Sequence, residues 1–159
     1  MAEKSTIETR KANRDDVLSI TRIFYNTIVE VNSKDYPPDQ VEDWASWHTD
    51  TDAWKKKLEE QHFIIASIDA VDVGFASIAP DGYLDFLFVH YRFQRMGIAN
   101  VLINKIEKLA RLQGNSTIYS DVSITAKDFF LKKGFYVEKQ QLKRSKEKEL
   151  VNFRMSKKL

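Results

Sequence analysis

The chain has 159 residues, of which 43% are hydrophobic and 30% charged, and its formal net charge at pH 7 is +2. This composition is typical of one globular domain with a buried core, so we treat residues 1–159 as a single domain. The absence of cysteine excludes disulfides, thiolate metal ligands and a cysteine nucleophile. The net charge is too small to indicate a nucleic-acid partner, and no apolar run is long enough to span a membrane. Since the N-terminus also lacks an apolar leader, we expect a cytoplasmic protein.

The N-terminal third predicts one strand and then three helices. Residues 5–11 alternate apolar and polar side chains, as an edge strand does. Asn13 is placed to cap a helix whose apolar residues recur at helical spacing from Val17 to Val31. The run Asp35-Tyr36-Pro37-Pro38 breaks that helix, because proline lacks a backbone donor and restricts the residue before it. A second helix then begins at Pro38, and Thr51 caps a third.

A β region follows, with strands predicted at residues 62–68, 71–79 and 83–90. Short turns separate them, one of them at Pro80-Asp81-Gly82, so we expect an antiparallel meander. Residues 98–112 then show the period of an amphipathic helix, which Gly114 stops.

The loop between the last of these strands and this helix predicts an anion site. Its sequence is Gln94-Arg95-Met96-Gly97-Ile98-Ala99. The first turn of a helix leaves backbone N–H groups unpaired and carries the positive end of the helix dipole. Gly97 removes a Cβ where a phosphate would approach the backbone, and Ala99 keeps that surface small. Taken alone, the loop suits a nucleotide, any other anion or a plain strand-to-helix turn.

The chain continues with a strand at residues 116–122, a short helix at 125–133 closed by Gly134, and a hairpin of strands at 135–140 and 150–155. The first of these strands runs parallel to its predecessor if the intervening helix is a crossover. The charged segment 143–148 is expected to be a solvated hairpin tip, with a ligand's phosphate or an acidic partner as alternative contacts. The fold class is therefore α/β, with a mixed, mostly antiparallel sheet of about seven strands flanked by helices.

This order of elements, with the loop in that place, resembles the GNAT (GCN5-related N-acetyltransferase) superfamily over nearly the whole chain. The superfamily's pyrophosphate loop has the form Gln/Arg-x-x-Gly-x-Gly/Ala, which residues 94–99 match. A second family segment, Asn-x-x-Ala-x-x-apolar-Tyr-x-x-x-Gly-Phe, corresponds to residues 123–135 and keeps Ala126, Gly134 and Phe135 in register. Residues 36–40 followed by Trp44, together with residues 123–127, are similar to a bacterial subgroup of YafP-like N-acetyltransferases.

The resemblance implies acetyl-CoA as co-substrate and a small-molecule or peptide amine as acceptor. The loop amides would hold the coenzyme pyrophosphate, and the backbone of the preceding strand end would pair with the pantetheine arm. Ser123 stands where the family has asparagine; it would contact the same arm, cap the next helix, or do both. The cofactor-binding residues expected on this basis are Phe88, Val89, Gln94, Arg95, Met96, Gly97, Ile98, Ala99, Ser123 and Phe130. The histidines show no metal-ligand spacing, so no metal is expected. A homodimer is a candidate assembly because members of the superfamily are often dimers, but the sequence does not set the oligomeric state.

Two residues are candidates for the catalytic base. Asp85 is the one acidic residue inside an apolar strand, where burial would raise its pKa and suit it to accept a proton from an ammonium. Its alternative is a surface carboxylate or a partner for a lysine. His90, at the end of the same strand, titrates near neutral pH, with a solvated loop histidine as its alternative. The general acid is unassigned, because Phe130 replaces the tyrosine that often protonates the leaving thiolate.

Three aromatic residues are candidates for the acceptor site. Tyr36 and Trp44 belong to the segment that usually shapes this site in the superfamily, where aromatic walls hold a cation or a flat substrate. For Trp44 the alternative is a position in the core. Tyr83, at the start of the strand that carries Asp85, is the third candidate.

The first functional hypothesis is an N-acetyltransferase that moves an acetyl group from acetyl-CoA to a primary amine by direct transfer. The second, which Phe130 motivates, is an acyl-CoA-binding module with little or no turnover. A third is a nucleic-acid-binding or partner-binding domain that uses the basic hairpin tip.

Overall fold

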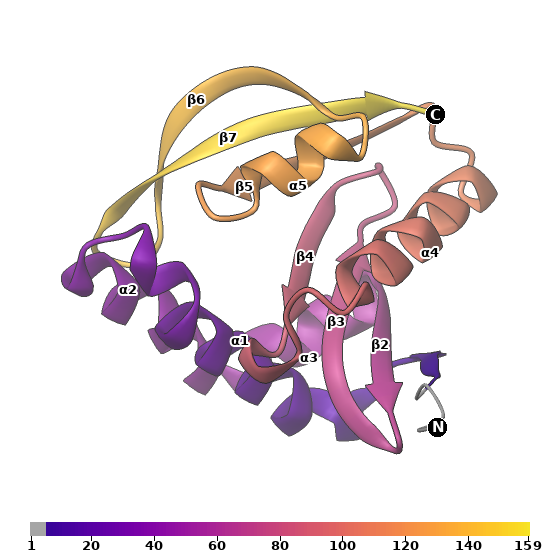
Figure 1. The fold of residues 1–159 in the computed structure, drawn as a ribbon, viewed down its shortest axis with the longest axis horizontal. Helices are drawn as coiled ribbons and strands as arrows, with labels where there is room; N and C mark the ends of the chain where they lie inside the picture. The colour runs from indigo at the N-terminus through magenta and orange to yellow at the C-terminus, as the bar shows by residue number, and fades with distance from the viewer. Residues whose placement is uncertain (1–5) are drawn as a thin grey trace.

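The computed structural model describes residues 6–159, and Figure 1 shows how the elements are arranged. This part of the chain forms seven strands, five α-helices and four short 3₁₀ turns. The strands are β1 (Ile7–Lys11), β2 (His62–Ile68), β3 (Val71–Ile78), β4 (Leu84–Val89), β5 (Thr117–Ser123), β6 (Tyr136–Arg144) and β7 (Glu149–Lys158). The α-helices are α1 (Val17–Glu30), α2 (Pro38–Ala45), α3 (Thr51–Glu60), α4 (Ile98–Leu112) and α5 (Lys127–Lys132). The 3₁₀ turns are η1 (Arg14–Asp16), η2 (Asn32–Lys34), η3 (Ser46–Thr49) and η4 (Tyr91–Phe93).

Local signals decide where the N-terminal helices begin. The Asn13 side chain accepts a hydrogen bond of 2.8 Å from the Asp15 N–H, so η1 and then α1 start after it, as predicted. Helix α1 ends at Glu30, before the break that was predicted at residues 35–38, and η2 lies between the end of the helix and that break. Helix α2 starts at Pro38, where the missing backbone donor costs nothing. The predicted cap of α3 is wrong by one residue: Asp50, and not Thr51, accepts from the Ala53 N–H at 3.2 Å.

The strands form two sheets instead of one continuous sheet. The first has the order β1-β2-β3-β4 and the second β5-β7-β6. The two sheets meet at a parallel bridge between Tyr83 and Tyr119, and the Ser120 hydroxyl donates to the Leu84 carbonyl at 2.7 Å beside it. Beyond this junction β4 and β5 separate. The predicted parallel pairing is therefore confined to the place where the two strands begin.

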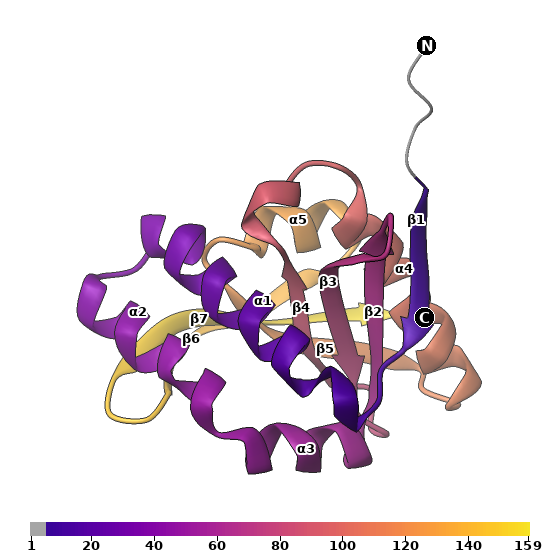
Figure 2. The ribbon, with the colours of Figure 1, turned by 90° about the horizontal axis from the view of Figure 1, so that it is seen from below.

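Helices α1 and α4 cover opposite faces of the first sheet, as Figure 2 shows with α1 in front of the strands. Each helix closes its own hydrophobic core, around Phe24 and Phe75 under α1 and around Leu102 and Ile106 under α4. The face of α4 predicted to be apolar is the buried face. Gly74 of β3 allows the close approach, because a Cβ there would lie 2.9 Å from the Phe88 carbonyl oxygen and 3.1 Å from an Ile98 methyl carbon.

The C-terminal hairpin is longer than predicted, and its tip contacts helix α2. The Asp43 carboxylate accepts hydrogen bonds from the backbone N–H groups of Lys146 at 2.9 Å, Glu147 at 3.0 Å and Lys148 at 3.3 Å. The Trp47 indole of η3 donates to the Ser145 hydroxyl at 3.0 Å. The charged tip is therefore fixed to the α2–η3 segment and is only partly the solvated turn that the sequence predicted.

Candidate functional site

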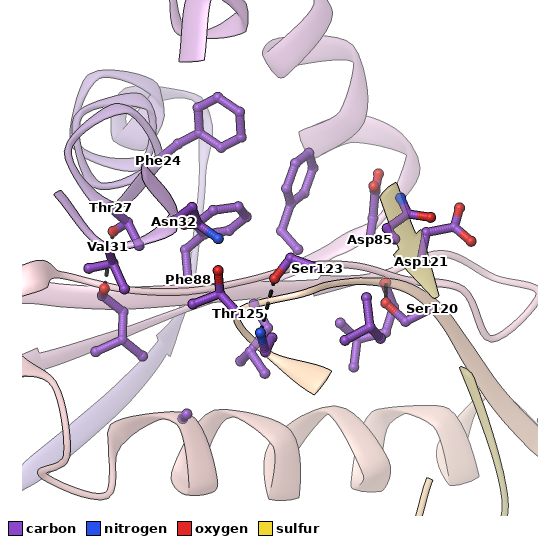
Figure 3. Close-up of a pocket in the computed structure, with 18 of the residues that line it drawn as sticks. Phe24, Thr27, Val31, Asn32, Asp85, Phe88, Ser120, Asp121, Ser123 and Thr125 are labelled. Atoms are coloured by element: carbon purple, nitrogen blue, oxygen red, sulfur yellow. Dashed lines mark hydrogen bonds between the residues drawn. The ribbon is translucent and has the colours of Figure 1, made fainter. Parts of the chain in front are cut away.

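The separation of β4 from β5 opens a cavity of about 680 Å³, a size suited to a small organic ligand. Residues of α1, α2, β4, β5 and the β6–β7 hairpin line it, together with the start of α4. In Figure 3 the side chains of Thr27 and Asn32 lie on one side of the cavity, and the carboxylates of Asp85 and Asp121 lie together on the other.

The predicted anion-binding loop lines this cavity directly before α4. Gly97 is the N-cap residue with φ +83°, and a Cβ built on it would meet no heavy atom within 4 Å, so the space beside it is open. Arg95 also has a positive φ, +60°, which is uncommon for a residue with a side chain and is found at functional sites. The amides at the start of the 15-residue helix face this space without intrahelical partners. Met96 does not line the cavity and is 52% exposed, so the structure does not bring it to the cavity with the other residues of the loop.

The edge of β4 offers backbone groups to the gap. The His90 N–H donates to the Val73 carbonyl at 2.8 Å, and antiparallel pairing turns alternate residues toward the partner strand. Phe88 is thus paired with β3, whereas Leu87 and Val89 turn their backbone groups toward β5. The sequence named Phe88 and Val89; the register assigns this edge to Leu87 and Val89, and Phe88 contributes its ring to the cavity wall.

The end of β5 holds the other side of the gap. The Ser123 hydroxyl accepts from the Ala126 N–H at 3.1 Å and closes the turn that precedes α5, and Ser123 also lines the cavity. The N-cap of α5 is Ala126, without a side-chain cap, so the predicted cap of this helix by Ser123 is wrong. Phe130 is 3% exposed and packs edge-on against Phe135. The Tyr36 hydroxyl donates to the Val151 carbonyl at 2.7 Å and accepts from the Ile124 N–H at 2.9 Å, which ties the α1–α2 connection to the second sheet.

Asp85 lies near the closed end of the gap and is paired with a lysine. One oxygen of its carboxylate accepts from the Lys57 ammonium at 2.7 Å and from the Gln61 amide at 2.8 Å. Its side chain is 12% exposed and lines the cavity. Asp85 therefore lines the cavity and is the partner of a lysine, which is the alternative that the sequence offered for it.

A second carboxylate, Asp121 of β5, escaped the sequence analysis. It accepts from Arg154 Nε at 2.8 Å, from Gln141 Nε2 at 2.7 Å, from the Tyr83 hydroxyl at 3.1 Å and from Lys143 Nζ. Burial raises the pKa of Asp121, but the hydrogen bonds from Arg154 and Lys143 outweigh it and hold that pKa well below its ordinary value. Burial and the nearby charges of Asp85 and Asp121 raise the pKa of Tyr83, so its hydroxyl stays protonated. One sequence signal could have found Asp121: side chains alternate between the two faces of a strand, so Asp121 lies on the same face of β5 as Ser123.

Aromatic rings form another part of the cavity wall. Trp44 packs edge-on against Tyr36 at 5.6 Å and against Phe88 at 6.3 Å between ring centroids. Tyr36, Trp44 and Tyr83 all line the cavity, as do Trp47 and Trp54. Trp44 thus packs against neighbouring aromatic rings and also lines the cavity.

His90, the second candidate for the catalytic base, lies outside the cavity lining. Its Nδ1 accepts a hydrogen bond of 3.0 Å from the Arg92 N–H. Its ring stacks on Tyr91 at 4.8 Å between centroids. Burial, and then the charge of Arg92, lower the pKa of His90 and favour the neutral ring. His90 therefore caps η4, the 3₁₀ turn that follows β4, and we assign it no role in catalysis.

Within residues 6–159, no group of three or more histidine, aspartate or glutamate side chains is arranged to hold a metal ion. None of the described helices has the length and apolarity needed to cross a bilayer.

Comparisons with known proteins agree on one family. The model of the acetyltransferase (GNAT) domain matches residues 32–159. The uncharacterized N-acetyltransferase YafP of Escherichia coli is 32% identical over 151 residues, which are 95% of each chain. A crystal structure of a GCN5-related N-acetyltransferase (aminotransferase, class II) from Rhodopseudomonas palustris has a TM-score of 0.94 at 31% identity, over 100% of this chain and 99% of that chain. PaiA N-acetyltransferase from Thermoplasma acidophilum, solved with coenzyme A, has a TM-score of 0.81 at 20% identity over 97% of this chain and 99% of that chain, a likeness of fold.

Proposed function

The chain belongs to the GNAT family of acetyltransferases, and we propose that it moves an acetyl group from acetyl-CoA to a primary amine by direct transfer. The observation that carries this proposal is one continuous cavity that joins the Gln94–Ala99 loop to the polar end at Asp85. Helix-start amides suit a pyrophosphate, and a carboxylate suits the removal of a proton from an amine. A cytoplasmic location and a possible homodimer remain predictions from the sequence.

We assign coenzyme binding to the loop and to the two strand ends. The open space beside Gly97 fits a phosphate close to the backbone, and the free edge of Leu87 and Val89 fits the amide-containing arm. The Val89 carbonyl already accepts from the Thr27 hydroxyl at 3.0 Å and from the Gln94 amide at 2.7 Å. Its N–H is consequently the group of Val89 that is left to polarise a carbonyl in the gap.

Acetyl-CoA supplies the acetyl group as an activated thioester, so the protein has to position the amine and to handle two protons. We assign the first proton to Asp85, directly or through a water, because this carboxylate lines the cavity and has a single cationic partner among residues 6–159. Asp121 is the poorer acceptor, since Arg154 and Lys143 both stabilise its charged form. Lys57 would orient the Asp85 carboxylate.

The second proton, needed by the leaving thiolate, has no donor at residue 130. Phe130 is packed among other aromatic rings and has no hydroxyl, so we infer that solvent in the open cavity supplies this proton. The same residue favours the second candidate function, an acyl-CoA-binding module with little or no turnover.

One experiment separates the two functions. The protein is incubated with acetyl-CoA and panels of amino acids, polyamines, aminoglycosides and peptides, and release of free thiol is measured against a reaction without amine. Coenzyme A binding is measured in parallel by calorimetry. Amine-dependent thiol release with formation of the acetylated amine supports the transferase, whereas tight coenzyme A binding without transfer to any amine supports the binding module.

A further inference from the structure

The polar end of the cavity holds more positive than negative charge. Asp85 is paired with one cation, Lys57 at 2.7 Å. Asp121, whose side chain is 5% exposed, is shared by two cations, Arg154 at 2.8 Å and Lys143. Of these three cations Lys57 and Lys143 line the cavity and Arg154 does not, and together they outnumber the two carboxylates, which favours a ligand that brings a negative charge of its own.

Lys143 is the most exposed of the three cations, because the side chain of Lys57 is 41% exposed and that of Arg154 is 31% exposed. It reaches from the C-terminal hairpin to the cavity wall, where its ammonium lies 5.8 Å from the centroid of the Tyr83 ring. Its side chain is 51% exposed although one of its N–H groups is bound to Asp121. An ammonium has three donors, so Lys143 keeps donors for a ligand while Asp121 fixes its position.

Asn152 adds a neutral donor on the same wall. Its side-chain oxygen accepts from Gln141 Nε2 at 2.9 Å, and the same Gln141 nitrogen donates to Asp121 at 2.7 Å. This chain of hydrogen bonds fixes which way the Asn152 amide points. The N–H groups of Asn152 are therefore the part of the amide left for a bound molecule, and Asn152 lines the cavity.

We propose that the acceptor is an amine that also carries a carboxylate, with the carboxylate bound by Lys143 and Asn152 and the amine directed to Asp85. The aromatic wall formed by Trp44 and Trp47 accommodates an apolar body between the two charged groups. Asp121 is a positioning residue, since it holds Lys143 without being the group that receives the ligand. This inference deepens the proposed transferase function and rests on it for turnover, but not for binding.

The test uses matched acceptors that differ in one charge: phenylalanine, phenylalanine amide and phenethylamine, with spermidine as a polycation. Both the acetylation kinetics and the binding of each compound to the coenzyme A-loaded protein are measured. Loss of one charged hydrogen bond corresponds to roughly a tenfold change or more, so phenylalanine is expected to have a kcat/KM and an affinity at least about tenfold higher than the other three.

Two variants assign the effect to residues. Lys143→Gln is expected to raise KM for phenylalanine about tenfold or more and to raise KM for phenylalanine amide by a much smaller factor. Asp121→Asn is expected to lower the same preference while KM for acetyl-CoA stays constant. Lys105→Gln, which changes an exposed lysine of α4 outside the cavity, is the matched control and should keep the preference.

The outcomes separate this inference from the function on which it rests. If amines are acetylated but the amide, phenethylamine or spermidine is preferred, the carboxylate inference is wrong and the transferase stands. If carboxylate-dependent binding is seen without acetylation of any amine, the transferase is wrong and the recognition site stands. A preference for phenylalanine that survives Lys143→Gln in a folded variant overturns the assignment to Lys143.

Discussion

The side-chain amide of Gln94 donates a hydrogen bond of 2.7 Å to the backbone carbonyl of Val89, five residues earlier in the chain. This contact ties the loop that starts α4 to the end of β4. The two proposed parts of the coenzyme site, the helix-start amides and the strand edge, are thus held in one fixed geometry. Preorganisation of this kind lowers the entropy lost when a flexible ligand binds.

Gly97→Ala is the first prediction, because it tests the loop. At φ +83° an alanine is strained by about 1 kcal/mol or more, and its methyl group enters the space assigned to a phosphate. We expect KM for acetyl-CoA to rise on the order of tenfold, as measured by steady-state kinetics. Gly114→Ala is the control, since Gly114 also has a positive φ, +81°, with no heavy atom within 4 Å of its Cβ position, and lies at the other end of α4. Equal effects of both variants on KM would argue against a phosphate site at Gly97.

Asp85→Asn tests the proton acceptor. The amide keeps the shape but cannot take a proton, so kcat should fall about 100-fold or more, with KM for acetyl-CoA unchanged. Lys57→Met is the comparison, because it breaks the 2.7 Å ion pair and keeps the carboxylate. A base is indicated if kcat falls far more in Asp85→Asn than in Lys57→Met. An unchanged kcat in Asp85→Asn would contradict the assignment.

Phe130→Tyr tests the source of the second proton. If solvent protonates the thiolate without limiting turnover, the added hydroxyl should leave kcat within about twofold of the parent. The measurement is kcat at saturating acetyl-CoA, with a melting curve to show that the buried position accepts the hydroxyl. A rise of about tenfold or more would mean that the missing acid limits turnover.

Asp121→Asn tests the buried carboxylate through stability. The folded-state pKa of Asp121 is lowered, so its stabilisation is fully present above the unfolded value of about 3.9 and is lost as pH falls below it. We expect the variant to lose about 2 kcal/mol of unfolding free energy at pH 7 in urea titrations, and the difference from the parent to shrink near pH 3. Glu59→Gln, at an exposed position of α3, removes the same charge without the cluster and should change stability by less than about 0.5 kcal/mol. A difference that is independent of pH would contradict the role of the charge.

Much of the fold was readable in the sequence because its signals are local. The bounds of α4 at Ile98–Leu112 agree with the residues predicted from helical period and Gly114, and Asn13 caps the first helical turn as expected. The anion-binding loop was found in the same way, since a helix start and a glycine are neighbours in sequence. Such features depend on hydrogen bonds and side-chain spacing within a few residues.

Only the tertiary structure decided how the polar end of the cavity is built. Asp121 meets Lys143, Arg154 and Tyr83 across 22, 33 and 38 residues of sequence, and Asp85 meets Lys57 across 28. These contacts depend on the junction at Tyr83 and Tyr119, from which β4 and β5 separate, and no local pattern marks where two strands stop pairing. By itself, the sequence determined a glycine-containing loop before α4, an acidic residue on β4 and the lack of a hydroxyl at Phe130. The charge around each carboxylate was set by long-range packing, because a carboxylate acts as a base or as a fixed anion according to the cations that the fold brings to it.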